Sequence, residues 1–421
     1  MSVAAAPRAG SLWRVRQIRA VFVLSFAGLT SFSVTLAALP AWARQLGHPE
    51  GVVGTITGVM LAATVVTQLL TAGLLRRWSV RTLLVAGSLL LGLPTPLYLL
   101  AHDLWAFYAL SAVRGVGFAV VTVVAALAIP RAAPPERRGE AIGLFGLSAA
   151  VPMMVGISGG AALTLGGSFA AVAVLGALPV VALVLVPGVP AEIVGTTGST
   201  AITRVLSTLA LPAGLLLVTT AAGGGLVTLL PLQRPDGSVA AAALLAFGAV
   251  GMVTRWKVGP VLDRAGPRVV LPVLVACGVA GLAVVAAGLA GTAGVLVAGA
   301  ALFGVAYGGL QTVTLDLSYR AVPDRDAPAA SAVWNAAFDA GTGAGSAMLG
   351  FVGGTAWGGA GALVAGAVAV ALVGAAAALT ARRAPARGGA HDLVAEDTTA
   401  RTTDRTTDRT TDRTADPEGT A

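Results

Sequence analysis

The chain has 421 residues, of which 56% are hydrophobic and 11% are charged, and its mean hydropathy is +0.85. Soluble domains carry about 25% charged residues, so this chain lacks the polar surface that a water-soluble fold requires. Its formal charge of +8 comes from arginines scattered over many short segments, with Lys257 as the only lysine, and this scatter disfavours a nucleic-acid interface.

Apolar runs recur along nearly the whole chain at the length of about 20 residues that an α-helix needs to cross a bilayer. The runs are continuous and do not alternate at period two, which favours helices over a transmembrane β-barrel. We predict spans at residues 19–43, 52–75, 80–101, 104–130, 139–164, 168–187, 205–231, 238–257, 268–289, 292–319, 328–355 and 357–380. The predicted fold class is an all-α membrane protein with 12 transmembrane helices in two pseudo-symmetric six-helix halves.

Composition divides the chain further. A stretch rich in Gly, Thr and Pro separates the sixth and seventh spans and is typical of a linker. The polar end of the chain repeats T-T-D-R and cannot bury enough apolar surface to offset the entropy of ordering, which predicts disorder. We predict a cytoplasmic N-terminal segment 1–18, a six-helix bundle 19–187, a cytoplasmic linker 188–204, a second six-helix bundle 205–380 and a disordered cytoplasmic tail 381–421.

The arginines indicate the orientation of the predicted spans. If successive spans alternate in direction, only Arg44 and Arg234 fall in loops on one side, and the other loop arginines fall on the opposite side. We call these two faces the arginine-poor end and the arginine-rich end. Loops rich in Lys and Arg stay in the cytoplasm, so both termini are expected there.

Two charged segments, about half a chain apart, are similar to each other. Residues 259–268 read G-P-V-L-D-R-A-G-P-R and are expected to form a loop, and residues 73–81 read G-L-L-R-R-W-S-V-R. Both resemble the G-x-L-x-D-R-x-G-x-R loop signature of the major facilitator superfamily, although Arg77 replaces the acid in the earlier copy. Further resemblance lies in R-G-V-G-F-A from Arg114, P-P-E-R-R-G-E-A from Pro134 and W-N-A-A-F-D-A-G from Trp334.

The resemblance covers roughly residues 15–380 and is nearest to the 12-helix bacterial efflux permease or drug:proton antiporter branch. It implies a transporter that works by alternating access, and not an enzyme. The antiporter motif of helix 5 in that family, G-x-x-x-G-P-x-x-G-G, is matched in part, because Val151 stands where glycine precedes the proline. The direction of transport is left open by this departure.

Three charged residues fall deep within the predicted spans: Arg114, Asp316 and Asp339. A charge at the bilayer centre costs about 2.5–3.5 kcal/mol on insertion scales, which makes each a functional candidate. Arg114 and Asp339 have similar predicted depths, so both are expected to face a central cavity. Asp339 would carry a proton, and Arg114 would set its proton affinity or orient the substrate; a purely structural pair is the alternative. Asp316 precedes Arg320 by four residues, which predicts an intrahelical ion pair.

Uncharged candidates for the cavity are polar or aromatic residues of the spans: Gln68, Gln311, Asn335, Tyr307, Trp334, Phe338, Phe118 and Phe32. A pocket rich in aromatic residues with few polar groups suits a lipophilic or amphipathic substrate. For each aromatic side chain, packing or contact with lipid is the alternative.

Pseudo-symmetry predicts a gate at the arginine-rich end with two contacts between the halves. In one, Asp263 approaches Arg137 and Arg138; in the other, Arg77 approaches Asp324 and Asp326. The remaining members of the predicted gating set are Gly73, Arg81, Gly259, Arg264, Gly266 and Arg268.

The leading interpretation is a secondary active transporter in the cell membrane that carries out proton-coupled efflux of a small lipophilic or amphipathic compound. A uniporter or proton symporter that imports a metabolite, and a membrane sensor without transport activity, are the alternatives. No G-x-x-x-x-G-K nucleotide loop and no cysteine or histidine cluster for metal occurs in the sequence, so no cofactor is expected. The expected partners are a small-molecule substrate, protons and the lipid bilayer, with the chain acting as a monomer.

Overall fold

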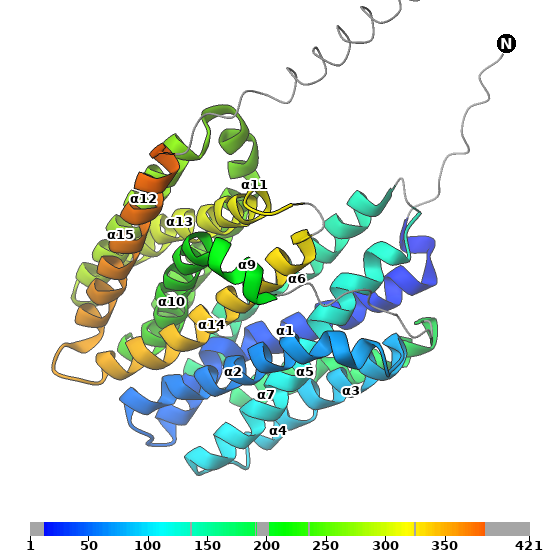
Figure 1. Cartoon of the computed structure of the whole chain (residues 1–421). Coiled ribbons are helices and arrows are strands. Elements are labelled where there is room, and N and C mark those ends of the chain that lie inside the picture. Colours follow the sequence, from blue (N-terminus) through cyan, green and yellow to red (C-terminus); the bar gives the residue numbers. More distant parts are fainter. Residues whose placement is uncertain are drawn as a thin grey trace, which may run out of the picture. The chain divides into compact units, whose positions relative to one another are not determined.

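The computed structural model describes residues 12–134, 137–189, 191, 202–234, 236–323 and 326–383. All regular elements in these residues are helical (Figure 1). In chain order they are η1 Leu12–Arg14, α1 Arg16–Gln45, α2 Glu50–Leu75, α3 Val80–Gly92, α4 Pro94–Leu97, α5 Leu104–Arg131, α6 Arg138–Leu165, α7 Phe169–Gly176, α8 Leu178–Val181, η3 Ala182–Gly188, α9 Ile202–Thr208, α10 Ala210–Gln233, α11 Gly237–Ala265, α12 Pro267–Ala290, α13 Ala293–Arg320, α14 Ala327–Gly353 and α15 Gly358–Arg383.

The all-helical, membrane-spanning character predicted from hydropathy is confirmed. Among the described residues, 11 helical segments are long and apolar enough to cross a membrane. α14 is not one of them, although it has 27 residues, because Asn335, Asp339 and a high content of Gly and Ser lower its mean hydropathy. The count of 12 spans therefore stays a prediction that depends on α14.

Proline interrupts three of the predicted spans. Pro94 has no N–H to continue the ladder of α3, and the chain restarts there as the short α4. Pro212 likewise cannot donate to the C=O of Thr208, and α9 ends at Thr208 before α10 begins at Ala210. The sixth span is divided into α7, α8 and the 3₁₀ helix η3, with Pro179 in α8.

The predicted loop at residues 259–268 is largely helical, which corrects the expected end of the eighth span at residue 257. α11 continues to Ala265, and α12 begins at Pro267. Gly266 alone lies between them, at φ 74°, where its N–H bonds to Leu262 O at 2.8 Å. Charged residues at a membrane surface are compatible with a helix, so the polar stretch that suggested a loop forms the last turns of α11. The chain turns at the glycine, which can adopt a positive φ.

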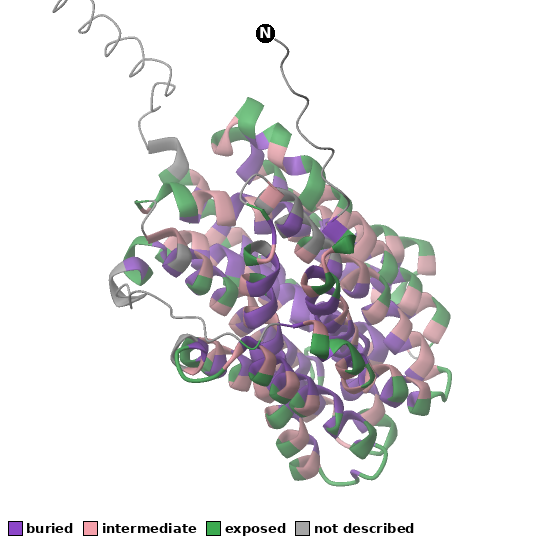
Figure 2. Cartoon of the chain, turned by 90° about the vertical axis from the view of Figure 1, so that its right-hand side faces the viewer, coloured by how far each residue is buried: buried purple, intermediate pink, exposed green. Residues whose placement is uncertain are grey.

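The helices pack in two sets within the compact unit Met1–Ala378. In the first set, α1 packs on α6, and α2 and α3 pack on α5; in the second set, α10 packs on α14, and α11 and α12 pack on α13. α2 contacts α14 and α6 contacts α11, so these two helix pairs join the sets. Buried residues lie along the inner faces of the helices, as Figure 2 shows.

Residues Leu379–Ala421 form a separate unit, of which the structure describes the end of α15. The helix runs to Arg383, so it includes the first three residues that the sequence assigned to the tail. The T-T-D-R repeat and most of the predicted linker lie outside the described residues.

Candidate functional site

α2 and α14 meet along a stripe of small residues. A Cβ atom added to Gly54 would lie 2.0 Å from Ser346 O, and one added to Gly58 would lie 3.3 Å from Gly343 O. The two backbones are therefore in direct contact, which only residues without large side chains permit. We call this stripe the seam; its members are Gly51, Gly54 and Gly58 of α2 and Gly343, Ser346, Ala347 and Gly350 of α14.

Two further contacts between the two helix sets lie at the same end as the seam or at mid-length. The side-chain amide of Gln233 donates to Glu50 Oε1 at the arginine-poor end. Gly248 of α11 lies against Met154 of α6, where an added Cβ would be 3.4 Å from the Met154 Cα atom. These contacts and the seam lie between the arginine-poor end and the middle of the helices.

Asp339 lies where the seam ends, one helical turn before Gly343. Its Oδ2 atom accepts a hydrogen bond of 2.7 Å from Gln68 Nε2, which comes from α2 in the first helix set. The side chain is only 7% exposed, and among the described residues no Lys, Arg or His nitrogen lies within 4.0 Å of its carboxylate. Asp339 is therefore a buried acid whose partner across the two sets is a neutral amide.

Arg114 does not reach Asp339, so the predicted pair is wrong for this structure. Its Nη2 atom donates to Ser31 O at 3.1 Å and to Thr35 Oγ1 at 2.9 Å, and its Nε atom donates to Leu91 O at 3.2 Å. It is 0% exposed and lies inside the first helix set, joining α1, α3 and α5. Similar depth along two helices says nothing about the direction in which each side chain points, and Arg114 points into its own set.

The packing of Arg114 predicts a structural effect for its removal. Replacement by alanine would leave a cavity and remove its hydrogen bonds to α1 and α3, and we expect a loss of about 2–4 kcal/mol of stability. Arg114→Lys should restore only part of this, because a single ammonium cannot reproduce the planar fork of donors. Thermal unfolding of purified protein in detergent measures the effect. A variant with wild-type stability but no transport would show instead that Arg114 acts in the transport cycle.

A second polar cluster lies in the second helix set and includes a residue that sequence reasoning missed. Arg255 Nη1 donates to Gln311 Oε1 at 2.8 Å, and its guanidinium lies 6.0 Å from the ring centroid of Trp334. Arg255 was grouped with the arginines of the following loop because it lies only two residues before the expected end of the eighth span at residue 257. The extension of α11 to Ala265 instead puts it more than two turns inside the helix.

The aromatic candidates divide between this cluster and the protein core. Tyr307 and Trp334 each lie near Phe338, with ring centroids 6.3 Å and 5.8 Å apart. Phe32 and Phe118 stack on each other at 4.1 Å and are buried in the first set, which is a packing role. Asn335 is exposed, and its amide donates to Ser331 O of its own helix at 2.8 Å.

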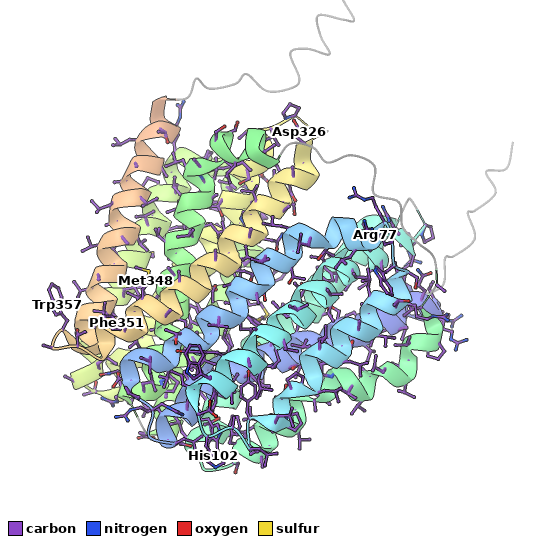
Figure 3. All side chains as sticks on the ribbon, turned by 60° about the horizontal axis from the view of Figure 1, so that its bottom comes forward. Arg77, His102, Asp326, Met348, Phe351 and Trp357 are labelled. Carbon is purple, nitrogen blue, oxygen red and sulfur yellow. The ribbon has the colours of Figure 1, made fainter. Side chains whose placement is uncertain are left out.

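The predicted gating residues are largely dispersed. Arg77 is exposed, and Figure 3 shows Arg77 and Asp326 at the ends of different helices, not pointing toward one another. Asp263 interacts electrostatically with Arg320 of its own set, and Arg81 Nε donates to Val189 O at 2.8 Å.

The other gating candidates lie on or beside the helix ends: Gly73 in α2, Gly259 and Arg264 in α11, Gly266 between helices, Arg268 in α12 and Arg137 before α6. Asp324 and the side chain of Arg138 lie outside the described residues. The predicted ion pair within α13 is confirmed, since Arg320 Nε lies 2.7 Å from Asp316 Oδ2.

The seam was also missed from sequence, although a signal for it exists. Gly51, Gly54 and Gly58 are spaced by three and four residues and so share one face of α2. Small residues at this spacing favour close helix contact in membranes. What the spacing could not indicate is that the partner is α14, far away in the chain.

Comparison with known proteins shows the family of the chain. A family model described as Major Facilitator Superfamily matches residues 21–290. Comparison with curated protein sequences gave no significant match.

Several solved transporter structures share the fold. The chain is similar to a bacterial homolog of the human lysosomal transporter Spinster in an inward-facing and unoccupied conformation, with a TM-score of 0.73 at 14% identity over 89% of this chain and 98% of that one. It is similar to a D-xylose-proton symporter with a TM-score of 0.68 at 14% identity, covering 88% and 97% of the two chains. It is also similar to the nucleoside transporter NupG, with a TM-score of 0.65 at 12% identity, covering 87% and 99%.

Proposed function

The chain belongs to the major facilitator superfamily, and we propose that within it the chain is a secondary active transporter that exports a small lipophilic or amphipathic compound in exchange for protons. Asp339 carries this proposal. Its carboxylate is buried at the junction of the two helix sets, with the neutral Gln68 amide as its hydrogen-bond partner. An ionised carboxylate without a cation is costly in such surroundings, so the group is stable when it holds a proton or binds a cationic ligand. Asp339 can therefore release its proton when a cationic ligand binds and take up a proton when that ligand leaves.

The seam supports alternating access around this carboxylate. Direct backbone contact between α2 and α14 closes the arginine-poor end, and Asp339 lies just where that contact stops. Rocking of one helix set against the other would break the seam and expose Asp339 to the opposite face. We expect the arginine-rich end to be cytoplasmic. In this proposal the protein lies in the plasma membrane, crosses it 12 times and works as a monomer.

Import of a polar metabolite is the second candidate. The hydrogen bond from Arg255 to Gln311, beside the aromatic ring of Trp334, favours it, because these groups could bind a polar or anionic substrate. Direction of transport distinguishes the two functions.

Flux in oriented vesicles tests the proposal. In inverted membrane vesicles with an acidic interior, we expect wild-type protein to accumulate tetraphenylphosphonium, a lipophilic cation, and to release protons from the vesicle as it does so. A pH-sensitive dye and the radiolabelled cation measure the two movements together. Coupled export would be contradicted if accumulation of tetraphenylphosphonium did not depend on the proton gradient. It would also be contradicted if the cation moved only down its own concentration gradient.

The position of α14 predicts a labelling pattern for the two loops that flank it. In a Cys277→Ser background, Ala356→Cys at the arginine-poor end should react with a membrane-impermeant maleimide in intact cells. Ala321→Cys, which follows α13, should react only after the membrane is permeabilised. Both positions are exposed, so access to the reagent decides the result. Equal labelling of both in intact cells would mean that α14 does not cross the membrane.

A further inference from the structure

A crevice of about 580 Å³ lies between α2 and α14 and reaches Asp339. Its walls are formed by small and branched apolar residues of the two helices, with Asp339 as the one charged residue: Thr55, Gly58, Val59, Ala62, Val65, Val66, Ala340, Gly343, Ala344 and Ala347 complete the lining. This volume falls within the range of about 300–1,000 Å³ that small-molecule sites occupy.

The crevice is on the outer side of the seam. On α2, Thr55, Val59, Ala62 and Val66 follow one another at helical spacing, and Val66 is 58% exposed. Leu61, on the other side of the seam, is 0% exposed and belongs to the hydrophobic core shared by the two helix sets. The crevice therefore opens away from the core, on a face that a bilayer covers in a membrane-spanning protein.

Asp339 connects this outer crevice with the interior. Its carboxylate lines the crevice and also accepts the hydrogen bond from Gln68. On α2, Gln68 lies seven residues after Leu61 and therefore shares its inward face. The Asp339 carboxylate thus lines the crevice on the lipid side and accepts the Gln68 hydrogen bond on the interior side.

We propose that the crevice is a side entrance and binding site for a membrane-dissolved cationic amphiphile. Its apolar body lies along the valines and alanines of α2 and α14, and its cationic group pairs with Asp339. This inference rests on the proposed export function and names both the substrate class and the route of entry. The charge decides the class: the lining offers a single buried acid and no basic residue, so a cation gains from the site and an anion is repelled.

The test measures binding of radiolabelled tetraphenylphosphonium to purified protein in lipid nanodiscs. Ala62→Trp and Ala344→Trp fill the crevice from opposite walls and keep Asp339; each should weaken binding at least tenfold. Asp339→Asn should weaken it as much or more. Val368→Trp on α15 is the matched control, because this position is 52% exposed and is not part of the crevice lining. This variant should bind tetraphenylphosphonium with the affinity of wild type.

A second measurement covers the case in which a tryptophan disturbs the seam. In a Cys277→Ser background, a nitroxide at Ala344→Cys should lose collisions with membrane-dissolved oxygen when tetraphenylphosphonium is added, and one at Val368→Cys should not. Unchanged affinity of both crevice variants, equal loss in the Val368→Trp control, or absence of binding by wild type would each overturn the inference. Failure of the proposed function is distinguishable, since it appears as absent proton-coupled flux in vesicles whatever the crevice variants bind.

Discussion

Replacing Gly54 by alanine is expected to force the arginine-poor end open. The new Cβ would lie 2.0 Å from Ser346 O, and a backbone atom cannot rotate away as a side chain can. Overpacking of this kind costs about 1–3 kcal/mol, which shifts the ratio of closed to open protein by about 5- to 150-fold. Since each transport cycle must close this end, flux should fall by a similar factor.

Distances between spin labels at Leu46→Cys and Ala356→Cys, in a Cys277→Ser background, report the separation of the two helix sets at that end. Gly54→Ala should lengthen and broaden the distribution. Gly159→Ala on α6 is the matched control, because its Cβ would meet no atom within 4 Å.

Gly160→Ala separates the seam effect from a general packing defect. Its Cβ would lie 1.9 Å from Val34 O, a contact between α6 and α1 within the first helix set. It should lower thermal stability without lengthening the distance between the labels. An unchanged distance in Gly54→Ala would show that the seam is not what keeps the end closed.

Replacing Asp339 by asparagine is expected to abolish proton coupling. Asparagine preserves the size of the side chain and can still bond to Gln68, but it can neither release a proton nor attract a cation. We expect proton-driven accumulation of tetraphenylphosphonium in inverted vesicles to fall at least 100-fold, and the remaining flux to be independent of pH. Asp339→Glu should keep part of the coupling because it retains a carboxyl group.

Asp316→Asn is the control for this experiment. Asp316 is also an acid within a helix, but it is 28% exposed and pairs with Arg320 one turn away. Exposed ion pairs contribute about 0–1 kcal/mol, so coupling and stability should both stay close to wild type. Full coupling in Asp339→Asn would remove Asp339 from the mechanism and with it the main support for the proposed function.

The fold was predictable from sequence to the extent that it depends on local hydropathy. Continuous apolar runs located the helices, and proline explains where they break. The end of α11 was predicted eight residues too early, because the charged stretch with Asp263 and Arg264 was interpreted as a loop when it continues a helix at the membrane surface.

The site was predictable only in part, because it depends on contacts between distant segments. Asp339 and Gln68 were both identified, but nothing in the sequence showed that they bond to each other from opposite helix sets. Arg114 was assigned to the cavity from its depth alone, and depth does not give the direction of a side chain around the helix axis. Arg255 was missed because the eighth span was predicted to end two residues after it, which placed Arg255 at the membrane surface and not inside the helix.

The composition of the seam has a consequence for the speed and reversibility of the conformational change. Long side chains that interlock lose rotamer freedom when two surfaces meet, and each such loss adds to the free-energy difference between states. Glycine and alanine have no side-chain rotamers to lose, and Ser346 already bonds to Thr228 of its own helix set at 2.5 Å. Closing the seam therefore costs its residues almost no side-chain rotamer freedom. Two surfaces of this kind can join and separate repeatedly with little entropic bias toward either state, which suits a protein that must do so once for every molecule it carries.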